Sequence, residues 1–330
     1  MDRRALLKSY QETYSLADRF RQAIRDQILN LLEHAQLHVA VPIESRTKGW
    51  SSIVHKVDRL PMLLTEVKEV KDLWDLIGLR CIFPFSSEAA RACSLIEQNF
   101  HVQYRKDVGD VRNPKEFGYQ SVHFVVSLLQ DWLTVPSLRE FESFRAEIQI
   151  RTLSQHTWAV ASRLLQYNQE AAVPVSVQRS LHRVAALMEL VDLELERVSE
   201  ERSAYRKELV SNDGLDKHLD KQLNVDLLIE VIDKRLPESY RIHDDDYGGL
   251  LHDLGKCNIT TARQVIELIR KHLANALTND AAAVQAVQSG DLSYSGDQDR
   301  IIKGIFYTHV GLVQNMLNTE FGTSWRRDTT

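Results

Sequence analysis

A cluster of cations and hydroxyls between residues 46 and 59 is the first group whose spacing could do chemistry. Its members are Arg46, Lys48, Ser51, Ser52, Lys56 and Arg59. Lys48, Ser52 and Lys56 are four residues apart, so on a helix they would share one face. Such a face suits a polyphosphate, because each cation offsets a phosphate charge and the hydroxyl donates a hydrogen bond. Taken alone, this spacing fits a solvated basic face better than a binding site.

Two acidic residues stand in segments that otherwise have the pattern of buried strands. Asp75 begins the run DLIGLR, and Glu147 lies inside the run AEIQIRT. Charged side chains are rarely buried without partners. Two carboxylates on neighbouring strands could hold Mg²⁺, which prefers oxygen ligands and shares them with substrate phosphates. The alternative is that the carboxylates pair with Arg80 and Arg151, and the spacing alone does not decide between these interpretations.

A third group follows the pattern of a loop that leads into a strand, in the sequence NPKEFGYQSVH at 113–123. Tyr119 stands directly before the expected strand, close to Lys115, Gln120 and His123. A loop aromatic in this setting could stack on a nucleobase while the lysine meets a phosphate. On this segment alone, an ordinary hairpin with a packed tyrosine is the better interpretation.

The first half of the chain alternates between strand and helix patterns. Apolar residues recur at helical spacing from 15 to 37, with Ser15 as a candidate N-cap, and a polar helix is expected at 51–60. A capped helix is expected from Ser86 or Ser87 onward. The expected strands are HVAVPIES at 38–45, LIGLRCIFPF at 76–85, VQYRKDV at 102–108, QSVHFVVSL at 120–128 and RAEIQIRT at 145–152. Together they predict an α/β fold, a mixed sheet of four or five strands flanked by helices.

Beyond residue 153 the strand pattern ends and helices are expected throughout. Apolar residues at 181, 184, 188, 191, 195 and 198 form a heptad seam. We favour packing of this seam against its own domain over self-association, although a homo-oligomer or a regulatory partner remains an alternative. Further helices are expected in VDLLIEVIDKRL, in TARQVIELIRKHLANAL with Thr260 or Thr261 as cap, and in DRIIKGIFYTHVGLVQNML.

Composition limits the classes of protein that this chain can belong to. Its 330 residues include 41 basic and 46 acidic side chains, a net charge of -5, which excludes a bulk polyanion binder but leaves room for a local basic pocket. The three cysteines form no CxxC pair, so neither a disulfide framework nor a zinc site is indicated. Neither a signal peptide nor a membrane-spanning run is visible, so a cytoplasmic protein with no membrane partner is expected.

Four motifs, in this order and at these spacings, resemble the synthetase domain of the RelA/SpoT family, the (p)ppGpp synthetases. They are R-x-K-x-x-x-S-I-x-x-K (Arg46 to Lys56), D-L-I-G-L-R (Asp75 to Arg80), P-K-x-x-G-Y-Q-S-x-H (Pro114 to His123) and E-I-Q-I-R-T-x-x-x-H (Glu147 to His156). The resemblance covers about residues 37 to 168. It implies a nucleotidyltransferase-like core that moves pyrophosphate from ATP to the 3′-hydroxyl of GTP or GDP and releases AMP.

The resemblance also implies a role for each matching residue. ATP would be bound by Arg46, Lys48, Ser52, Lys56 and Arg80. The acceptor nucleotide would be bound by Lys115, Tyr119, Gln120, His123 and Arg151, with Tyr119 stacked on the base. Asp75 and Glu147 would hold Mg²⁺, the implied cofactor. Glu147 would also activate the acceptor hydroxyl, with Gln149 in support.

Three alternatives stay open at this point. Toxin-type members of the family would use the 3′ end of tRNA or an adenosine nucleotide as acceptor. The pair His252–Asp253 is also found in metal-dependent phosphohydrolases, although further ligands lack a recognisable context. A non-catalytic nucleotide-binding module is the third.

The chain is expected to divide into a helical segment at 1–36, a synthetase domain at 37–170, a long helix at 171–211 and an α-helical domain at 212–330. The last of these could regulate the synthetase.

Overall fold

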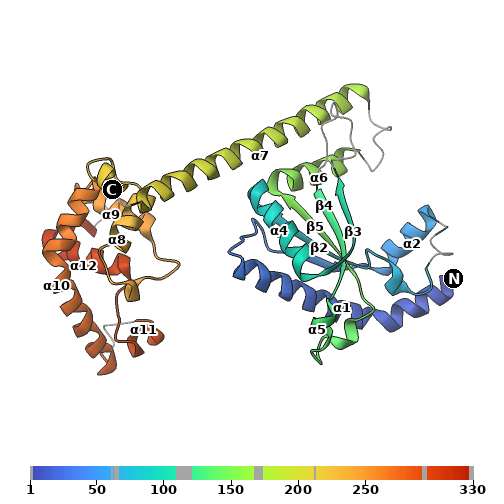
Figure 1. Cartoon of the computed structure of the whole chain (residues 1–330), viewed down its shortest axis with the longest axis horizontal. Helices are drawn as coiled ribbons and strands as arrows, with labels where there is room; N and C mark the ends of the chain where they lie inside the picture. The colour runs from blue at the N-terminus through green and yellow to red at the C-terminus, as the bar shows by residue number, and fades with distance from the viewer. Residues whose placement is uncertain are drawn as a thin grey trace. The chain divides into compact units, whose positions relative to one another are not determined.

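The computed structural model describes residues 3–60, 62, 67–108, 121–166, 174–211, 213–291 and 296–326. The chain forms two compact units, Met1–Ser199 and Glu200–Thr330. The first unit contains the strands, with α1, α4 and α6 around them (Figure 1). The α/β fold class and the helical C-terminal region expected from the sequence are confirmed. The finer domain boundaries remain predictions.

A five-stranded mixed sheet organises the first unit. In spatial order its strands are β1 (Glu44–Thr47), β2 (Ile77–Phe83), β5 (Ala146–Thr152), β4 (Ser121–Ser127) and β3 (His101–Val108). β2 and β5 are parallel, and the other neighbouring pairs are antiparallel. The central pair therefore places residues 78 and 147 side by side, because the register pairs Gly78 with Glu147.

Alternation along the strands separates an apolar face from a polar one. Leu79, Phe124 and Ile148 point into the main core, and α1 (Arg3–His34) and α4 (Ser86–Asn99) cover that face. Glu147 and Gln149 are half-buried on the opposite face. Since successive residues of a strand point to opposite faces, one strand can pack the core and present polar groups at the same time.

Two sequence expectations near the N-terminus are wrong. The first helix begins at Arg3 rather than after Ser15, and Phe20, Ile24 and Ile28 bury its apolar stripe. The segment 38–43 is not a strand: its one ladder-like bond runs from the Ala40 N–H to the Ile82 carbonyl at 2.7 Å. The strand begins at Glu44 instead. The helix expected at 51–60 is confirmed as α2 (Trp50–Arg59).

The helix α4 begins at Ser86 as expected, but neither serine hydroxyl caps it. Its N-cap is Phe85, which provides no side-chain hydrogen bond. The Glu196 carboxylate, from α7 (Val175–Val210), accepts a hydrogen bond from the Ser87 N–H at 2.9 Å. An acidic group at a helix N-terminus satisfies a free N–H and complements the helix dipole. α7 also accepts a bond from β5, since the Thr152 hydroxyl donates to Asp192 at 2.6 Å.

The heptad seam of α7 is mostly exposed. Leu181 is buried against Trp158 of α6 (Leu153–Gln166). Val184 and Val198, by contrast, are 40% and 55% exposed. Val191 and Leu195 are exposed as well. Met188 also packs against this cluster. The expected packing of the seam against its own domain is therefore correct for Leu181 and Met188 and wrong for the other four positions.

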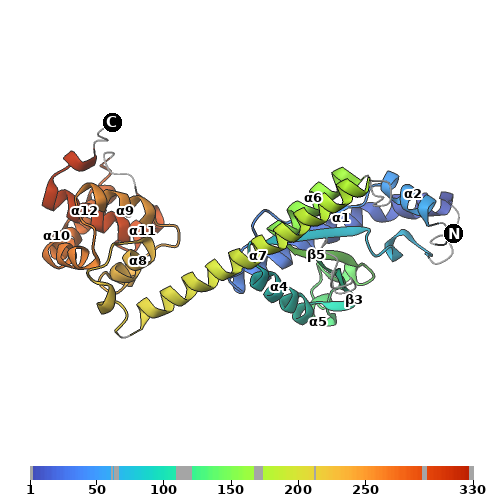
Figure 2. The ribbon, with the colours of Figure 1, turned by 90° about the horizontal axis from the view of Figure 1, so that it is seen from above.

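Helices α8 to α12 gather in the second unit (Figure 2). Their bounds are α8 (Val225–Asp233), α9 (Tyr247–Lys256), α10 (Ala262–Gln288), α11 (Gln298–Ile302) and α12 (His309–Phe321). Thr261 caps α10 through a capping box with Gln264, as its sequence predicts. The sequence predicted one helix across 299–317, but the structure has two, α11 and α12. Gly304 has a φ of +74°, a left-handed conformation that ends the first helix, and Thr308 is the N-cap of the second. Within the described ranges, none of the helices is long and apolar enough to cross a membrane.

Candidate active site

A tight turn before β2 places the first candidate carboxylate. The Leu76 N–H donates to the Leu73 carbonyl at 3.1 Å, and both leucines are buried. Trp74 and Asp75 are the two central residues of this turn, so the buried ends direct both side chains away from the core. Asp75 is thereby held at the start of β2, on a short segment with a fixed geometry.

Two lysines hold the Asp75 carboxylate. Lys48 lies just before α2 and is 9% exposed, and its ammonium contacts one Asp75 oxygen. Lys56, on α2, donates to the other oxygen at 2.8 Å. Burial raises the pKa of Asp75, but the two lysines outweigh it, so that pKa lies below its ordinary value. Asp75 is therefore ionised at neutral pH.

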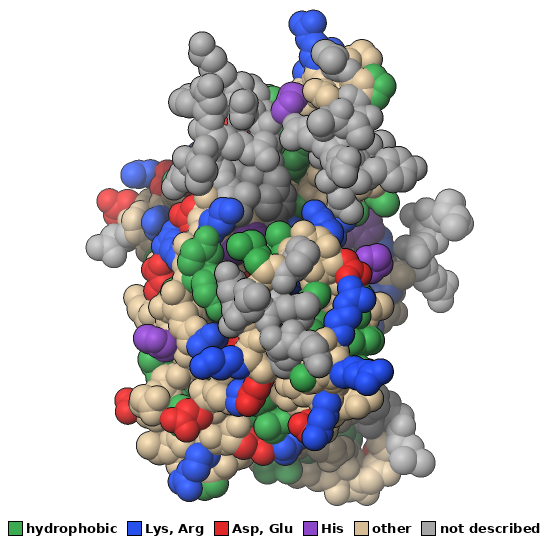
Figure 3. Space-filling view, turned by 90° about the vertical axis from the view of Figure 1, so that its right-hand side faces the viewer, with side chains coloured by type: hydrophobic (Ala, Val, Ile, Leu, Met, Phe, Trp, Pro, Cys, Tyr) green, Lys and Arg blue, Asp and Glu red, His purple; other side chains and the backbone are tan. Residues whose placement is uncertain are grey.

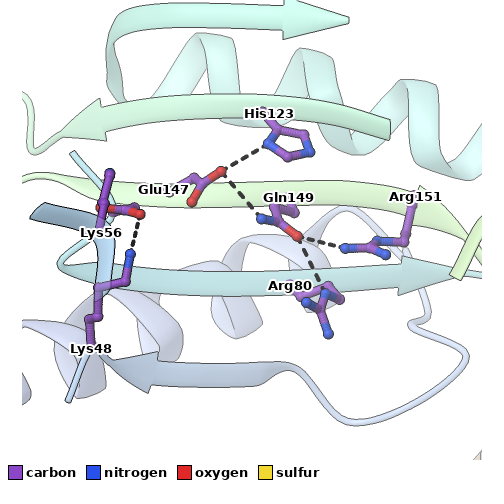
Figure 4. Close-up of polar contacts among 8 residues, drawn as sticks. Lys48, Lys56, Arg80, His123, Glu147, Gln149 and Arg151 are labelled. Atoms are coloured by element: carbon purple, nitrogen blue, oxygen red, sulfur yellow. Dashed lines mark hydrogen bonds and ion pairs between the residues drawn. The ribbon is translucent and has the colours of Figure 1, made fainter. Parts of the chain in front are cut away.

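The second carboxylate, Glu147, is held through one of its oxygens. His123 Nδ1 lies 2.8 Å from Glu147 Oε1, and the Gln149 amide donates to the same oxygen at 3.2 Å (Figure 4). Burial raises the pKa of Glu147. The hydrogen bonds from His123 and Gln149 and the charge of His123 together lower it by more than burial raises it, so the pKa lies below its ordinary value. The negative charge of Asp75 acts in the opposite direction, which shows that the two carboxylates sense each other.

Two guanidinium groups fix the orientation of Gln149. Arg151 donates to the Gln149 carbonyl oxygen at 2.6 Å and Arg80 donates to it at 3.4 Å (Figure 4). Arg80 also forms an ion pair with Glu44. Because both neighbours of that oxygen are donors, the amide nitrogen must face Glu147. The arrangement keeps a carboxylate ionised and aimed in one direction.

A cavity of about 220 Å³ joins these groups on the polar face of the sheet. It is lined by Glu44, Ser45, Arg46, Asp75, Gly78, Leu79, Arg80, Glu147, Gln149 and Arg163. The Arg46 side chain runs over Gly78: a Cβ on this glycine would lie 3.9 Å from Arg46 Cγ. Three arginines and three carboxylates thus share one pocket, which suits a phosphorylated ligand and a cation together.

The structure brings together most of the residues singled out from the sequence. Lys48 and Lys56 meet at Asp75, although Lys48 precedes the helix on which the spacing would have placed it. Ser52 lies exposed on α2. Lys115, Tyr119 and Gln120 lie outside the described residues.

Sequence reasoning missed Arg163 and did not use His156 as a site residue. The two are seven residues apart on α6, a spacing that puts them on one helix face and could have revealed them. The charges of Arg151 and Arg80 reach His156, whose pKa is lowered by burial and then by Arg151. The phosphohydrolase alternative finds no support: His252 is exposed, and within the described ranges no three His, Cys, Asp or Glu side chains converge as metal ligands.

Two carboxylates in one pocket fit a magnesium ion. Mg²⁺ is usually bound by one or two protein carboxylates together with substrate phosphates and water. Asp75 and Glu147 meet that requirement, and their mutual repulsion favours a cation between them. Asp75 now contacts two lysines, so metal binding would replace at least one of those contacts.

Comparisons with known proteins agree with this geometry. The family model described as "Region found in RelA / SpoT proteins" matches residues 45–172. This segment therefore resembles the RelA/SpoT region. The GTP pyrophosphokinase YwaC of Bacillus subtilis (strain 168) is 29% identical over 164 residues, which cover 48% of this chain and 75% of the relative. The GTP pyrophosphokinase YjbM of the same strain is 28% identical over 188 residues, covering 54% and 84%.

Solved structures also resemble part of this chain. The small alarmone synthetase 1 from Bacillus subtilis bound to its product pppGpp has a TM-score of 0.45 and 25% identity, covering 60% of this chain and 98% of that one. A GTP pyrophosphokinase family protein from Streptococcus pneumoniae has a TM-score of 0.48 and 20% identity, covering 58% and 93%.

Proposed function

We propose that this protein transfers pyrophosphate from ATP to the 3′-hydroxyl of GTP or GDP, giving (p)ppGpp and AMP. The two curated relatives are GTP pyrophosphokinases. The observation that carries the proposal is Glu147, an ionised carboxylate that is held by His123 and Gln149 and lines the same pocket as Asp75. A ribose hydroxyl is a poor nucleophile and needs such a base at hydrogen-bond distance.

In the proposed reaction, Glu147 accepts the proton of the acceptor 3′-hydroxyl. The 3′-oxygen then bonds to the β-phosphorus of ATP, the bond between that phosphorus and the α–β bridging oxygen breaks, and AMP leaves with the electron pair. Lys48 and Lys56 would release Asp75 and bind the donor phosphates in its place. Arg46 and Arg80 would hold the rest of ATP. Transfer of this kind needs positioning and charge neutralisation more than covalent chemistry.

Magnesium belongs to the proposal as a cofactor. Asp75 and Glu147 would hold it, and it would neutralise charge on the transferred group. In the proposed site, the chain's own carboxylates set where that cation sits, and its lysines add the remaining positive charge.

Charge on the surface favours a small acceptor over a large polyanion. On the face drawn in Figure 3, described Lys and Arg side chains are interspersed with Asp and Glu. The net charge of -5 points the same way. A tRNA acceptor would require a basic surface beyond the catalytic groups and would bind with a strong dependence on salt.

The test offers purified protein Mg²⁺ and ATP labelled on the γ-phosphate, with GDP, GTP, ATP alone or deacylated tRNA as acceptor. Label on a guanine nucleotide, together with release of AMP, is the expected result. Label on tRNA or an adenosine nucleotide alone would replace this proposal with a toxin-type activity. No transfer to any acceptor would refute pyrophosphate transfer by the isolated chain and leave a nucleotide-binding module.

A further inference from the structure

The sheet holds the end of β5 on one side only. Its pairing with β2 continues to Thr152, opposite Phe83, whereas among the described residues its pairing with β4 ends at Ile150. Arg151 and Thr152 therefore extend past the β4 ladder. A cavity of about 530 Å³ adjoins the same strand end, and both residues line it. Strand pairing and close packing thus leave this end of β5 incompletely held.

A buried carboxylate on α7, Asp192, contacts this strand end. The Thr152 hydroxyl donates to Asp192 Oδ2 at 2.6 Å. Asp192 is 8% exposed, and within the described residues its other oxygen, Oδ1, accepts no hydrogen bond and the carboxylate forms no ion pair. Burial raises the pKa of Asp192. Because a buried carboxylate without a cation is costly and an apolar side chain would pack at lower cost, stability alone does not explain this residue.

Thr152 connects Asp192 to two elements at once. It is the last residue of β5, and its hydroxyl accepts a hydrogen bond from the Gln155 N–H at 3.1 Å. In return, the Thr152 N–H donates to the Gln155 side chain at 2.9 Å. This reciprocal pair is a capping box, which fixes the first turn of α6. Asp192 therefore holds, through one hydroxyl, both the end of β5 and the start of α6.

Both of these elements carry groups of the candidate active site. Arg151, the neighbour of Thr152, donates to the Gln149 carbonyl oxygen at 2.6 Å (Figure 4). The Gln149 amide in turn donates to Glu147 at 3.2 Å. Further along α6, Arg163 lines the 220 Å³ pocket. A displacement of about 1 Å that begins far from the chemistry can lower a rate by about a hundredfold. Release of the strand end would therefore reach the candidate base through two hydrogen bonds.

We propose that Asp192 is a positioning residue for the candidate active site. By binding Thr152 it holds the end of β5, and that strand end carries the guanidinium that orients Gln149 beside the candidate base. The inference rests on the proposed function, because positioning is measured through transfer. Asp192 lies on α7, beyond the matched segment 45–172, so the site depends on a helix outside that segment.

The test is a double-mutant cycle on transfer of the γ-label, measured in the full chain. Asp192→Ala should lower kcat by about tenfold to a hundredfold, because it releases the strand end. In a chain that already carries Gln149→Ala, the same substitution should lower kcat by less than about twofold, because the contact through which it acts is gone. A purely structural effect, such as loss of folded protein, would lower kcat by the same factor in both backgrounds.

Two further substitutions on α7 provide matched controls. Asp192→Asn keeps an oxygen that can accept from the Thr152 hydroxyl, so it should retain most of the activity that the alanine loses. Glu196→Ala, one turn further along the helix, removes the contact with the Ser87 N–H and leaves the contact with Thr152 in place. It should leave kcat unchanged, because the predicted effect belongs to the β5 contact and not to docking of α7 in general.

Amide hydrogen exchange gives a second readout that does not need transfer. In Asp192→Ala, exchange should become faster across residues 146–155, and in Glu196→Ala it should not. Unchanged exchange in Asp192→Ala, or an equal loss of kcat with and without Gln149→Ala, would overturn the positioning role even if pyrophosphate transfer is demonstrated. Faster exchange across this segment in a protein that shows no transfer would support the hold of Asp192 on β5 and refute the reaction.

Discussion

Replacing Asp75 by Asn should have opposite effects on stability and on nucleotide binding. The substitution keeps the shape of the side chain and removes the charge that Lys48 and Lys56 contact. Lys48 is 9% exposed, so it would lose its carboxylate partner in a largely desolvated position. The folded state therefore becomes less stable, while two cations become available to a phosphate.

The size of the stability loss follows from burial. Exposed ion pairs contribute about 0.2–1 kcal/mol, and breaking a buried pair costs about 3–5 kcal/mol. The Lys48 and Asp75 side chains are 10% and 25% exposed, between these limits, so we expect a loss of about 2 kcal/mol. With a urea m-value of about 2.5 kcal/mol/M, the midpoint should fall by about 0.8 M.

Tryptophan fluorescence suits this measurement, because four of the five tryptophans (Trp50, Trp74, Trp132 and Trp158) lie in the first unit. The control is Asp58→Asn, which breaks an exposed pair with Arg3 and should shift stability by less than about 0.5 kcal/mol. In EDTA, Asp75→Asn should bind ATP at least as tightly as the natural protein. With Mg²⁺ it should transfer no pyrophosphate. A wild-type urea midpoint, or near-normal turnover, would refute the reasoning.

Three further predictions concern Glu147 and the metal. Glu147→Gln should abolish transfer of the γ-label, more than a hundredfold, and leave ATP binding within about twofold; turnover near that of the natural protein would contradict the role of Glu147 as base. His123→Ala removes the bond that lowers the pKa of Glu147, so that pKa rises and the acidic limb of kcat/KM moves to higher pH; an unmoved limb would argue that another group titrates. EDTA should stop transfer and Mg²⁺ restore it, with GDP binding unaffected; transfer that persists in EDTA would exclude the metal.

Segments with one dominant periodicity could be predicted from the sequence. The nearly unbroken apolar run that became β2 is buried on its core face and at its C-terminal end, while Gly78 and Arg80 are half-buried on the polar face. β4 and β5 include the alternation of a sheet with one core face. The polar first half of α1, residues 3 to 14, lacks such a signal, since its stripe reaches the core mainly through Phe20, Ile24 and Ile28. Packing against the rest of the first unit, and not a pattern in the local sequence, therefore extends the helix back to Arg3.

The site residues that belong to sequence motifs could be predicted. The contacts that arise only from tertiary packing could not. Spacing could suggest that Lys48 and Lys56 act together, but not that Asp75 is their shared partner. Trp74 belongs to a turn, and its stacking partner Tyr104 is thirty residues away on an edge strand. No periodicity in the sequence connects a turn residue with an edge strand, so this pair becomes visible only once the strands are in register.

The contacts of Glu147 also determine where the transferred proton would go. Both hydrogen bonds that orient this carboxylate, from His123 and Gln149, end on Oε1, and within the described residues Oε2 receives none. In the proposed reaction one oxygen is thus committed to alignment and the other is left for the acceptor hydroxyl. The proton would settle on the oxygen that faces the substrate, and the alignment contacts would survive each turnover. The base can then return its proton to water without disassembling the network that positions it for the next cycle.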